Sequence, residues 1–215
     1  MRVIGLGAGG HAKVVIDILQ TAGGCELVGL LDASRLLWEK TVLGVRVLGG
    51  DDLLPELRGQ GVTHAFIGVG STGDTKPRQQ LYKKLHQYGF ELVSAVHPQA
   101  VVARSVKLRP GVTIMAGCIL NAHARIGANV VVNTGGIIEH DCVIGDHAFI
   151  GPGVRLGGTV EVGSGAHLGI GATVLQNIHI GKNAIVGAGA VVIEDVPDNT
   201  VVVGVPARVL RRIED

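Results

Sequence analysis

The second half of the chain has an apolar residue at every sixth position. Each member of this series is Val, Ile or Leu, and the seventeen members are Val96, Val102, Leu108, Ile114, Leu120, Ile126, Val132, Ile138, Ile144, Ile150, Leu156, Val162, Leu168, Val174, Ile180, Val186 and Val192. About one residue in three of the chain is of these types, so an unbroken series of this length has a chance probability on the order of 10⁻⁸ in one phase. The period of six therefore indicates a repeat fold from Val96 onward.

A second set of positions, four residues after each member of the series, is also small or apolar. Examples are Ala124, Val130, Gly136, Cys142, Ala148 and Val154. Both sets are expected to point into the fold. Glycine often follows the large residue, where a short strand must turn a corner and a Cβ would be penalised; such glycines are Gly127, Gly145, Gly151, Gly157, Gly163, Gly169, Gly181 and Gly187. Three hexads make one triangular turn of about eighteen residues, which predicts a prism of stacked coils.

Residues 1–90 have a different pattern, in which short apolar runs alternate with amphipathic segments. The expected elements are a strand at 2–6, a helix at 11–23, a strand at 25–34, a strand at 62–71 and a helix at 75–89. The first helix is expected to bury Val14, Val15, Ile18 and Leu19, and the second Leu81, Leu85 and Tyr88. Alternating strands and helices of this length predict a small βαβ unit.

Composition narrows the class of protein. The 215 residues include 34 glycines and are 47% hydrophobic but only 3% aromatic, which fits packing through many small, repeated contacts. A formal net charge of +1, with Lys and Arg scattered, argues against a nucleic-acid partner. No stretch reaches the roughly 20 apolar residues of a membrane span, and the three cysteines have neither disulfide nor CxxC spacing. We expect a cytoplasmic protein that does not insert into a membrane.

The N-terminal stretch GLGAGG fits the G-x-G-x-x-G pattern that cradles a dinucleotide pyrophosphate in many folds. A doubly wound dinucleotide enzyme needs two mononucleotide halves, whereas this chain changes to coils after one. Gly5, Gly7 and Gly10 could still let the backbone approach the phosphates of one nucleotide, with Asp32 at the end of the next strand near a ribose or base. The alternative is a tight strand-to-helix turn, with Asp32 as an ordinary strand-end residue.

The repeats resemble those of the hexapeptide-repeat acyltransferases, whose fold is a left-handed parallel β-helix. The stretches GAGGHAKVV, NTGGIIEHDCVIGDH and VVVGVPARVL together resemble the bacterial sugar acetyltransferases of that family over essentially the whole chain. Those enzymes include N-acetyltransferases of nucleotide-linked 4-amino-4,6-dideoxy sugars and sialic acid O-acetyltransferases. The resemblance implies an α/β, Rossmann-like nucleotide-sugar-binding domain over residues 1–92. It also implies a left-handed β-helix with a C-terminal tail over residues 93–215, which binds acetyl-CoA and carries the catalytic residues.

The resemblance also implies a function and a site. We expect an acetyltransferase that moves the acetyl group of acetyl-CoA to the 4-amino group of a GDP-perosamine- or UDP-bacillosamine-type sugar, as in polysaccharide biosynthesis. A sialic acid or other sugar O-acetyltransferase is the alternative. The implied catalytic residues are His140 as base and Asp141 as its partner. The implied substrate-binding residues are Gly7, Gly9, Gly10, His11, Asp32 and Asn133, and the residues assigned to acetyl-CoA are Gly158, Ile170, Ala188 and Arg208. Asn133 could instead be a polar corner residue.

The chemistry of acyl transfer independently requires a base and an oxyanion donor. Imidazole, with a pKa of about 6.5, accepts a proton near neutrality, and a carboxylate on its second nitrogen fixes the tautomer. Adjacent residues of a strand point to opposite faces, so His140 and Asp141 can pair only if the coil bends there, and Glu139 is the alternative partner. One turn beyond His140 lies Gly158, whose bare backbone makes its amide the candidate oxyanion donor.

The other histidines of the repeat region could be structural residues or ligands of a metal ion. Members of the family commonly carry a second histidine where this chain has Phe149, and His147 stands two places earlier. We expect His147, His123, His167 and His179 to be structural. A zinc enzyme resembling the γ-class carbonic anhydrases is a rival, but no two histidines of the repeat region are separated by a multiple of eighteen residues, so none would stack on another within the coils of one chain. No metal is expected. A noncatalytic sugar-nucleotide-binding protein is a third possibility.

The predicted prism should have apolar residues left on its outside. Val131, Ile137, Val143 and Val191 are expected on outer faces, and association around a common axis would cover them. The resemblance likewise implies a homotrimer with acetyl-CoA between two subunits.

Overall fold

The computed structural model describes residues 1–213, and the chain packs as two compact units. The first comprises residues 1–70 and 77–98, and the second comprises residues 71–76 and 99–213. The short segment Ser71–Lys76 thus belongs with the coils, although the residues on both sides of it belong with the first unit. The two units therefore alternate along the sequence, and a single boundary, such as the predicted one between residues 92 and 93, does not describe the position of residues 71–76.

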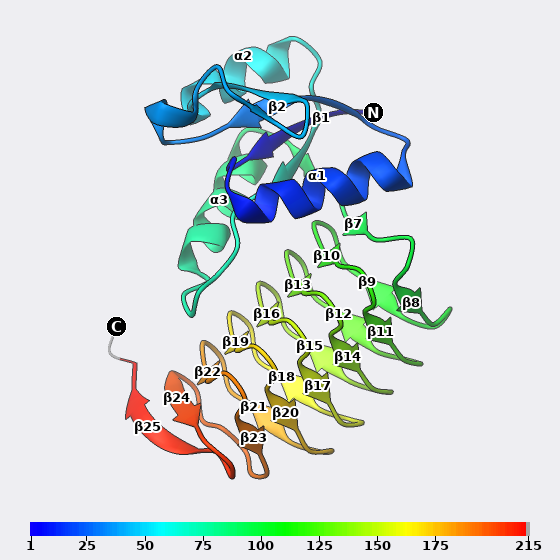
Figure 1. The fold of residues 1–215 in the computed structure, drawn as a ribbon, viewed down its shortest axis with the longest axis vertical. Coiled ribbons are helices and arrows are strands. Elements are labelled where there is room, and N and C mark those ends of the chain that lie inside the picture. Colours follow the sequence, from blue (N-terminus) through cyan, green and yellow to red (C-terminus); the bar gives the residue numbers. More distant parts are fainter. Residues whose placement is uncertain (214–215) are drawn as a thin grey trace. The chain divides into compact units, whose positions relative to one another are not determined.

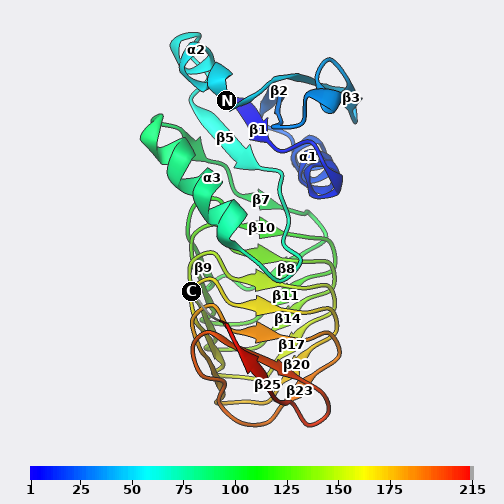
Figure 2. The same ribbon diagram turned by 90° about the vertical axis from the view of Figure 1, so that its left-hand side faces the viewer.

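The first unit is a six-stranded sheet in the order β3-β4-β2-β1-β5-β6, parallel except for the β3–β4 pair. Its elements are β1 (Arg2–Leu6), α1 (Gly10–Ala22), β2 (Glu26–Leu31), β3 (Thr41–Val42), β4 (Val45–Gly49), α2 (Leu54–Gly59), β5 (His64–Ile67), α3 (Lys76–Gln87) and β6 (Glu91–Leu92), with short 3-10 turns at Arg35–Leu37 and Asp51–Leu53. The two-residue strand β7 (Ala95–Val96) follows and is not part of this sheet. Helix α1 lies on one side of the sheet, and α2 and α3 lie on the other (Figure 2). This is the expected Rossmann-like arrangement, extended by β4 and α2, which the sequence pattern did not predict.

The predicted helix faces were partly wrong. In α1 the buried side chains are Ala12, Val15, Ile16, Ile18 and Leu19, whereas Val14 is exposed. In α3, Leu85 is buried and Leu81 packs against the same core, whereas Tyr88 follows the helix end and is exposed. Tyr88 lies outside the core because the helix ends at Gln87, one residue before it.

The second unit is a left-handed parallel β-helix whose two-residue strands stack in three sheets (Figure 1). The first sheet contains β10 (Thr113–Ile114), β13 (Val131–Val132), β16 (Phe149–Ile150), β19 (His167–Leu168), β22 (Ile185–Val186) and β24 (Thr200–Val203), and β25 (Arg208–Arg212) pairs antiparallel with β24. The second contains β8 (Val101–Val102), β11 (Ile119–Leu120), β14 (Ile137–Ile138), β17 (Arg155–Leu156), β20 (Thr173–Val174) and β23 (Val191–Val192), which form a ladder in Figure 2. The third contains β9 (Lys107–Leu108), β12 (Arg125–Ile126), β15 (Val143–Ile144), β18 (Glu161–Val162) and β21 (His179–Ile180).

The register explains the period of six. From β8 to β23 the strands pair one coil apart at an offset of eighteen residues, as in Arg125 with Val143 and Ile126 with Ile144, whereas β24 pairs with β22 at an offset of sixteen. The second residue of each strand is the member of the predicted series, and from Ile114 to Val192 every member is at most 3% exposed. The first residue of each strand points outward. The predicted series is therefore the inner lining of the prism.

The corner glycines are required by close approach of the neighbouring coil. A Cβ on Gly145 would lie 2.5 Å from the Ser164 nitrogen, and one on Gly163 would lie 2.5 Å from the Lys182 nitrogen. The left-handed backbone conformation falls later in each corner, where several residues other than glycine adopt it, among them Asn129 (φ 55°) and Asp141 (φ 59°). The close approach of the next coil thus requires glycine at the start of a corner, as at Gly145. The later position, as at Asp141, requires only a residue that can adopt a positive φ.

Candidate active site

His140 and Asp141 form a corner of one coil. The corner lies between β14 and β15, and Asp141 has a φ of 59°, which turns its side chain out of the strand alternation. The two side chains meet: His140 Nδ1 lies 2.9 Å from Asp141 Oδ2. The bend that the pairing requires is therefore present. A carboxylate on Nδ1 favours the tautomer with a proton on Nδ1 and leaves the Nε2 lone pair free to accept a proton.

Glu139, the alternative partner, is engaged elsewhere. Its Oε2 accepts a hydrogen bond of 2.9 Å from Asn121 Nδ2, one coil earlier. This bond leaves Asp141 as the carboxylate that contacts the imidazole.

Gly158 lies against the imidazole from the next coil. A Cβ at this position would be 2.7 Å from both Cε1 and Nε2 of His140, so only glycine leaves room for the ring in this orientation. Within residues 1–213 no acceptor is found for the Gly158 amide, whose carbonyl accepts from Asn177 N at 3.0 Å. An amide N–H without an acceptor, in the residue that lies against the candidate base, is what an oxyanion donor requires.

The glycine loop of the first unit is held by Asp32. The Ala8 amide donates to Asp32 Oδ2 and the Ser34 amide donates to Asp32 Oδ1, both at 2.8 Å. Gly7 has a φ of 97°, and a Cβ on Gly9 or Gly10 would meet no atom within 4 Å. The loop therefore leaves bare backbone at the start of α1, while both Asp32 oxygens have local partners.

His11 lies in the first turn of α1, beside a buried arginine. Its Nε2 is 3.4 Å from Arg78 Nη1, which also donates to the carbonyls of Ile67 and Val69. Burial, with a smaller contribution from the charge of Arg78, lowers the pKa of His11 to about 3. His11 is therefore neutral near pH 7 and accepts from the guanidinium through Nε2.

A cavity of about 510 Å³ on the β-helix brings together Asn133, Ile170 and Ala188. Its other lining residues include Ser71, Phe149 and His167, none of which was predicted as a site residue. His167 follows Phe149 by eighteen residues, so the coil spacing was the sequence signal that could have placed it here. Asn133 itself accepts a hydrogen bond from the Thr134 amide through Oδ1 at 2.8 Å.

The predicted residues of the β-helix lie on two different corners of each coil. Asn133, Ile170 and Ala188 belong to the corners that precede the second sheet, whereas His140 and Gly158 belong to the corners that follow it. Arg208 lies on β25 and donates to the Ala207 carbonyl at 2.9 Å. One chain therefore does not bring all of the predicted β-helix residues to one place.

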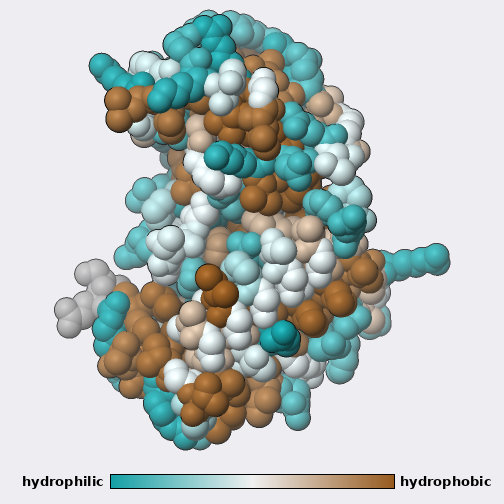
Figure 3. All heavy atoms as spheres, viewed as in Figure 1, coloured by the Kyte–Doolittle hydropathy of each residue, from teal (hydrophilic) through white to brown (hydrophobic). Residues whose placement is uncertain are grey.

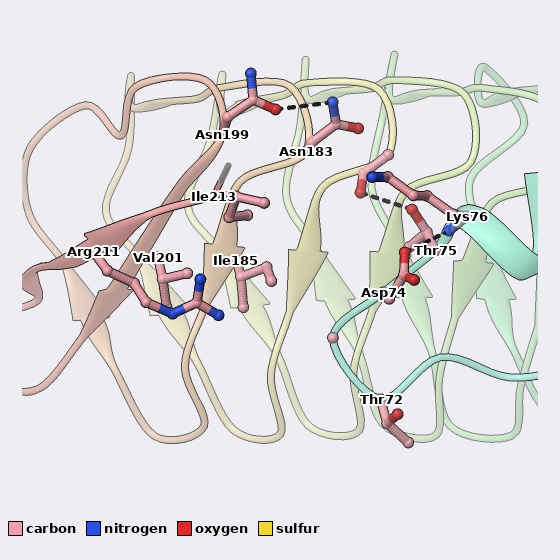
Figure 4. Close-up of a pocket in the computed structure, with 12 residues that line it drawn as sticks. Thr72, Asp74, Thr75, Lys76, Asn183, Ile185, Asn199, Val201, Arg211 and Ile213 are labelled. Carbon is pink, nitrogen blue, oxygen red and sulfur yellow. Dashed lines mark hydrogen bonds between the residues drawn. The ribbon is translucent and has the colours of Figure 1, made fainter. Parts of the chain in front are cut away.

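A second cavity, of about 540 Å³, contains none of the predicted site residues. It lies between the segment Thr72–Lys76 and the last strands, and Arg211 reaches over it from β25 toward Ile185 (Figure 4). Thr75 Oγ1 donates to the Gly165 carbonyl at 3.0 Å, and Asn183 Nδ2 donates to Asn199 Oδ1 at 3.1 Å. These bonds tie the segment and the corners together around the cavity.

Two of the remaining histidines have local partners. His147 Nδ1 lies 3.0 Å from Asn129 Nδ2, and His179 Nδ1 lies 3.6 Å from Glu161 Oε2. No group of three or more His, Cys, Asp or Glu residues within 1–213 is arranged to hold a metal ion. None of the helices over the same residues is long and apolar enough to span a bilayer.

Known proteins resemble this chain over most of its length. The PglD N-terminal domain matches residues 2–85. A perosamine N-acetyltransferase from Caulobacter crescentus, with one histidine replaced by asparagine and in complex with CoA and GDP-perosamine, is 43% identical, with a TM-score of 0.91 over 98% of this chain and 97% of that one. The acetyltransferase domain of PglB from Neisseria gonorrhoeae, in complex with acetyl coenzyme A, is 31% identical, with a TM-score of 0.89 over 97% and 98%. WeeI from Acinetobacter baumannii is 28% identical, with a TM-score of 0.84 over 98% and 100%. The chain therefore belongs to the sugar acetyltransferases of the hexapeptide-repeat family, which include perosamine N-acetyltransferase.

Proposed function

We propose that this chain transfers the acetyl group of acetyl-CoA to the 4-amino group of a nucleotide-linked 4-amino-4,6-dideoxy sugar, with His140 as the general base. The relative that is 43% identical was crystallised with CoA and GDP-perosamine, and this supports a substrate of the same class. The observation that carries the proposal is the contact of His140 with Asp141 on one side and with Gly158 on the other.

The reaction follows from this arrangement. The sugar amine attacks the thioester carbonyl carbon, and His140 Nε2 takes the proton that the nitrogen loses. The Gly158 amide donates to the oxygen that becomes negative in the tetrahedral intermediate. When the carbon–sulfur bond breaks, the imidazolium returns its proton to the CoA sulfur, so the base is regenerated. Asp141 holds the ring and stabilises its charged form.

The acceptor and acetyl-CoA are assigned to different surfaces. The open backbone of Gly9 and Gly10 at the start of α1 suits the phosphates of the sugar nucleotide, and His11 and Asp32 shape that loop. Ile170 and Ala188, in the cavity with Asn133, suit the acetyl-CoA arm. Arg208, on β25, is assigned to CoA from the resemblance to the sugar acetyltransferases.

We further propose that the protein works as a homotrimer. The cavity residues, such as Asn133, precede the strands of the second sheet, whereas His140 and Gly158 follow them. In a trimer, the His140 corner of one copy would lie at the cavity of the next. On that sheet Val101 is 63% exposed, and Ile137 and Val191 are partly exposed. Val131, predicted to be on an outer face, is instead fully buried within the chain. Val203, Val205, Val209 and Leu210 are also exposed around β24 and β25, where apolar atoms gather in Figure 3.

Sedimentation tests the assembly. A trimer at micromolar concentration is expected, and a monomer under these conditions would contradict a site shared between subunits. The cytoplasmic location expected from the cysteine spacing stays a prediction.

Removal of His140 tests the function. With acetyl-CoA and GDP-perosamine, His140→Ala should lower kcat by about 10²- to 10⁴-fold, and the KM for acetyl-CoA should barely change. The side chain of His140 is 61% exposed, so its loss should change the free energy of unfolding by less than about 1 kcal/mol. His179→Ala, which removes an exposed imidazole from a different sheet, is the matched control. Activity of folded His140→Ala within threefold of wild type would contradict the assignment.

The choice of acceptor needs a separate arm. UDP-linked 4-amino sugars and sialic acid should be assayed beside GDP-perosamine, because the same base could deprotonate a hydroxyl. If sialic acid were the only acceptor turned over, the proposed N-acetyltransferase activity would be wrong and the protein would be an O-acetyltransferase.

A further inference from the structure

The cavity that holds Asn133 and Ile170 also contains a buried imidazole that the proposed reaction does not use. His167 is 8% exposed and stands first in β19, with its side chain outside the prism. Its ring is stacked on that of Phe149, one coil earlier, with centroids 5.0 Å apart and an angle of 4° between the planes. The stack fixes the plane of the imidazole, so its two nitrogens have defined directions.

One of these nitrogens contacts the segment that crosses the coils. His167 Nδ1 lies 3.0 Å from Ser71 Oγ. The same hydroxyl donates to the Asp74 carbonyl at 3.0 Å and accepts from the Gly73 amide at 3.4 Å. A hydroxyl has one proton, and a carbonyl can only accept. The contacts of Ser71 with Asp74 and with His167 are therefore satisfied together when Ser71 donates to the Asp74 carbonyl and the Nδ1–H of His167 donates to Ser71.

The other nitrogen then carries a lone pair. Burial lowers the pKa of His167, so the ring is neutral near pH 7 and Nε2 is unprotonated in this tautomer. No hydrogen bond to His167 Nε2 is found within residues 1–213, and Nε2 is not among the fully buried side-chain atoms of that range that lack a bond, so part of its surface is accessible. An open acceptor thus lines a cavity whose other walls include the apolar side chains of Ile170 and Pro152.

We propose that His167, held as the Nδ1–H tautomer by Ser71, accepts through Nε2 a hydrogen bond from an N–H or O–H group of the ligand that enters this cavity. The inference rests on the proposed function for the identity of that ligand. An amide N–H of the pantetheine arm of acetyl-CoA and a hydroxyl or amine of the nucleotide-linked sugar supply the same donor chemistry. Ser71 is a positioning residue, because it acts by fixing the tautomer of His167.

Two substitutions separate ligand binding from a structural role. His167→Asn places an amide N–H near the position of Nδ1 and keeps a donor for Ser71, but it has no acceptor at the position of Nε2. His167→Gln places an amide oxygen near Nε2 and loses the donor to Ser71. If the acceptor matters, His167→Asn should weaken the binding of one ligand about tenfold, as for the loss of one hydrogen bond, and His167→Gln should recover most of it. If His167 only holds the segment 71–76, Asn should be the milder change.

Calorimetry on the unreacting full-length protein gives the Kd of acetyl-CoA and of GDP-perosamine separately, and thermal melts confirm folding. A loss confined to acetyl-CoA places the donor on the pantetheine arm, and a loss confined to GDP-perosamine places it on the sugar nucleotide. Either outcome supports the proposal. Wild-type affinity of His167→Asn for both ligands would overturn it.

The tautomer can be measured without any ligand. Imidazole ¹⁵N shifts of the wild type should show Nδ1 protonated and Nε2 unprotonated at pH 7, and Ser71→Ala should shift the ring toward a mixture of tautomers. A wild-type ring protonated on Nε2 would overturn the inference whatever the enzyme turns over. Failure of 4-amino sugars as substrates would instead overturn the proposed function and leave this measurement valid.

Discussion

Gly158→Ala should disable the candidate base, His140, by displacing its ring while leaving residue 140 itself unchanged. The added Cβ would stand 2.7 Å from Cε1 and Nε2 of His140, and ordinary contact begins at 3.4 Å. The ring must therefore retreat by about 0.7 Å or rotate away, and a misplacement of about 1 Å can cost on the order of 10²-fold in rate. We expect kcat to fall about 10²-fold in Gly158→Ala.

The same substitution should leave the fold nearly unchanged. Gly158 has no left-handed φ, so alanine can adopt its backbone conformation. The atoms it displaces are the far end of a side chain that is 61% exposed, and the ring can move into solvent. The change in the free energy of unfolding should stay below about 1 kcal/mol.

The assay compares kcat and KM for acetyl-CoA in wild type, Gly158→Ala and the matched variant Gly59→Ala. A Cβ on Gly59 meets no atom within 4 Å, so this control adds the same methyl group without displacing a side chain. Full activity of folded Gly158→Ala would refute the reasoning, because it would mean that catalysis does not depend on the present position of the His140 ring. A large loss of stability would refute the claim that the ring moves freely.

Three further substitutions test separate parts of the site. Asp141→Asn should lower kcat less than His140→Ala does, because asparagine tolerates the φ of 59° and can still orient the ring; a loss equal to that of His140→Ala would contradict a supporting role. Gly10→Val should weaken sugar-nucleotide binding and spare acetyl-CoA binding, since a Cβ there meets no protein atom within 4 Å; calorimetry that shows tight NAD binding to the wild type would contradict the assignment of this loop. His11 has a pKa of about 3 when folded, against about 6.5 when unfolded, so between these values the unfolded chain takes up a proton that the folded chain does not. Stability is therefore lost as the pH falls from 6.5, and the loss from His11 should reach about 2 kcal/mol by pH 5. Denaturant titrations at pH 7 and pH 5 should show a smaller pH dependence for His11→Gln, and an unchanged dependence would contradict the burial of a neutral ring.

The repeat could be predicted from sequence because every coil solves the same packing problem. Ile126 and Ile144 pair one coil apart and are both buried, so the pattern that marks one position marks all of them. The contact of His140 with Asp141 could be predicted only conditionally, since it depends on the left-handed φ at Asp141. The place of Gly158 followed from counting one coil along the chain.

The segment Ser71–Lys76 could not be predicted in the same way. Its contact with His167 joins residues 96 positions apart, and neither residue belongs to a periodic pattern that points to the other. Val131 was predicted to be exposed because it stands first in its strand, and the structure buries it completely. Local spacing determines which side of the prism wall a residue is on, but it carries no information about what covers that wall from outside.

The eighteen-residue offset between paired strands also restricts how a prism of this kind can change in length. An insertion of one whole coil adds a layer and leaves every other residue on its own sheet, because each coil contacts chiefly its neighbours. An insertion of six residues would move all later strands to the next sheet, and an insertion of one residue would exchange their inward and outward positions. We therefore expect the prism to lengthen by whole coils. His140 and Gly158 stay in contact only when no insertion of any length falls between them, because their contact depends on a spacing of eighteen residues.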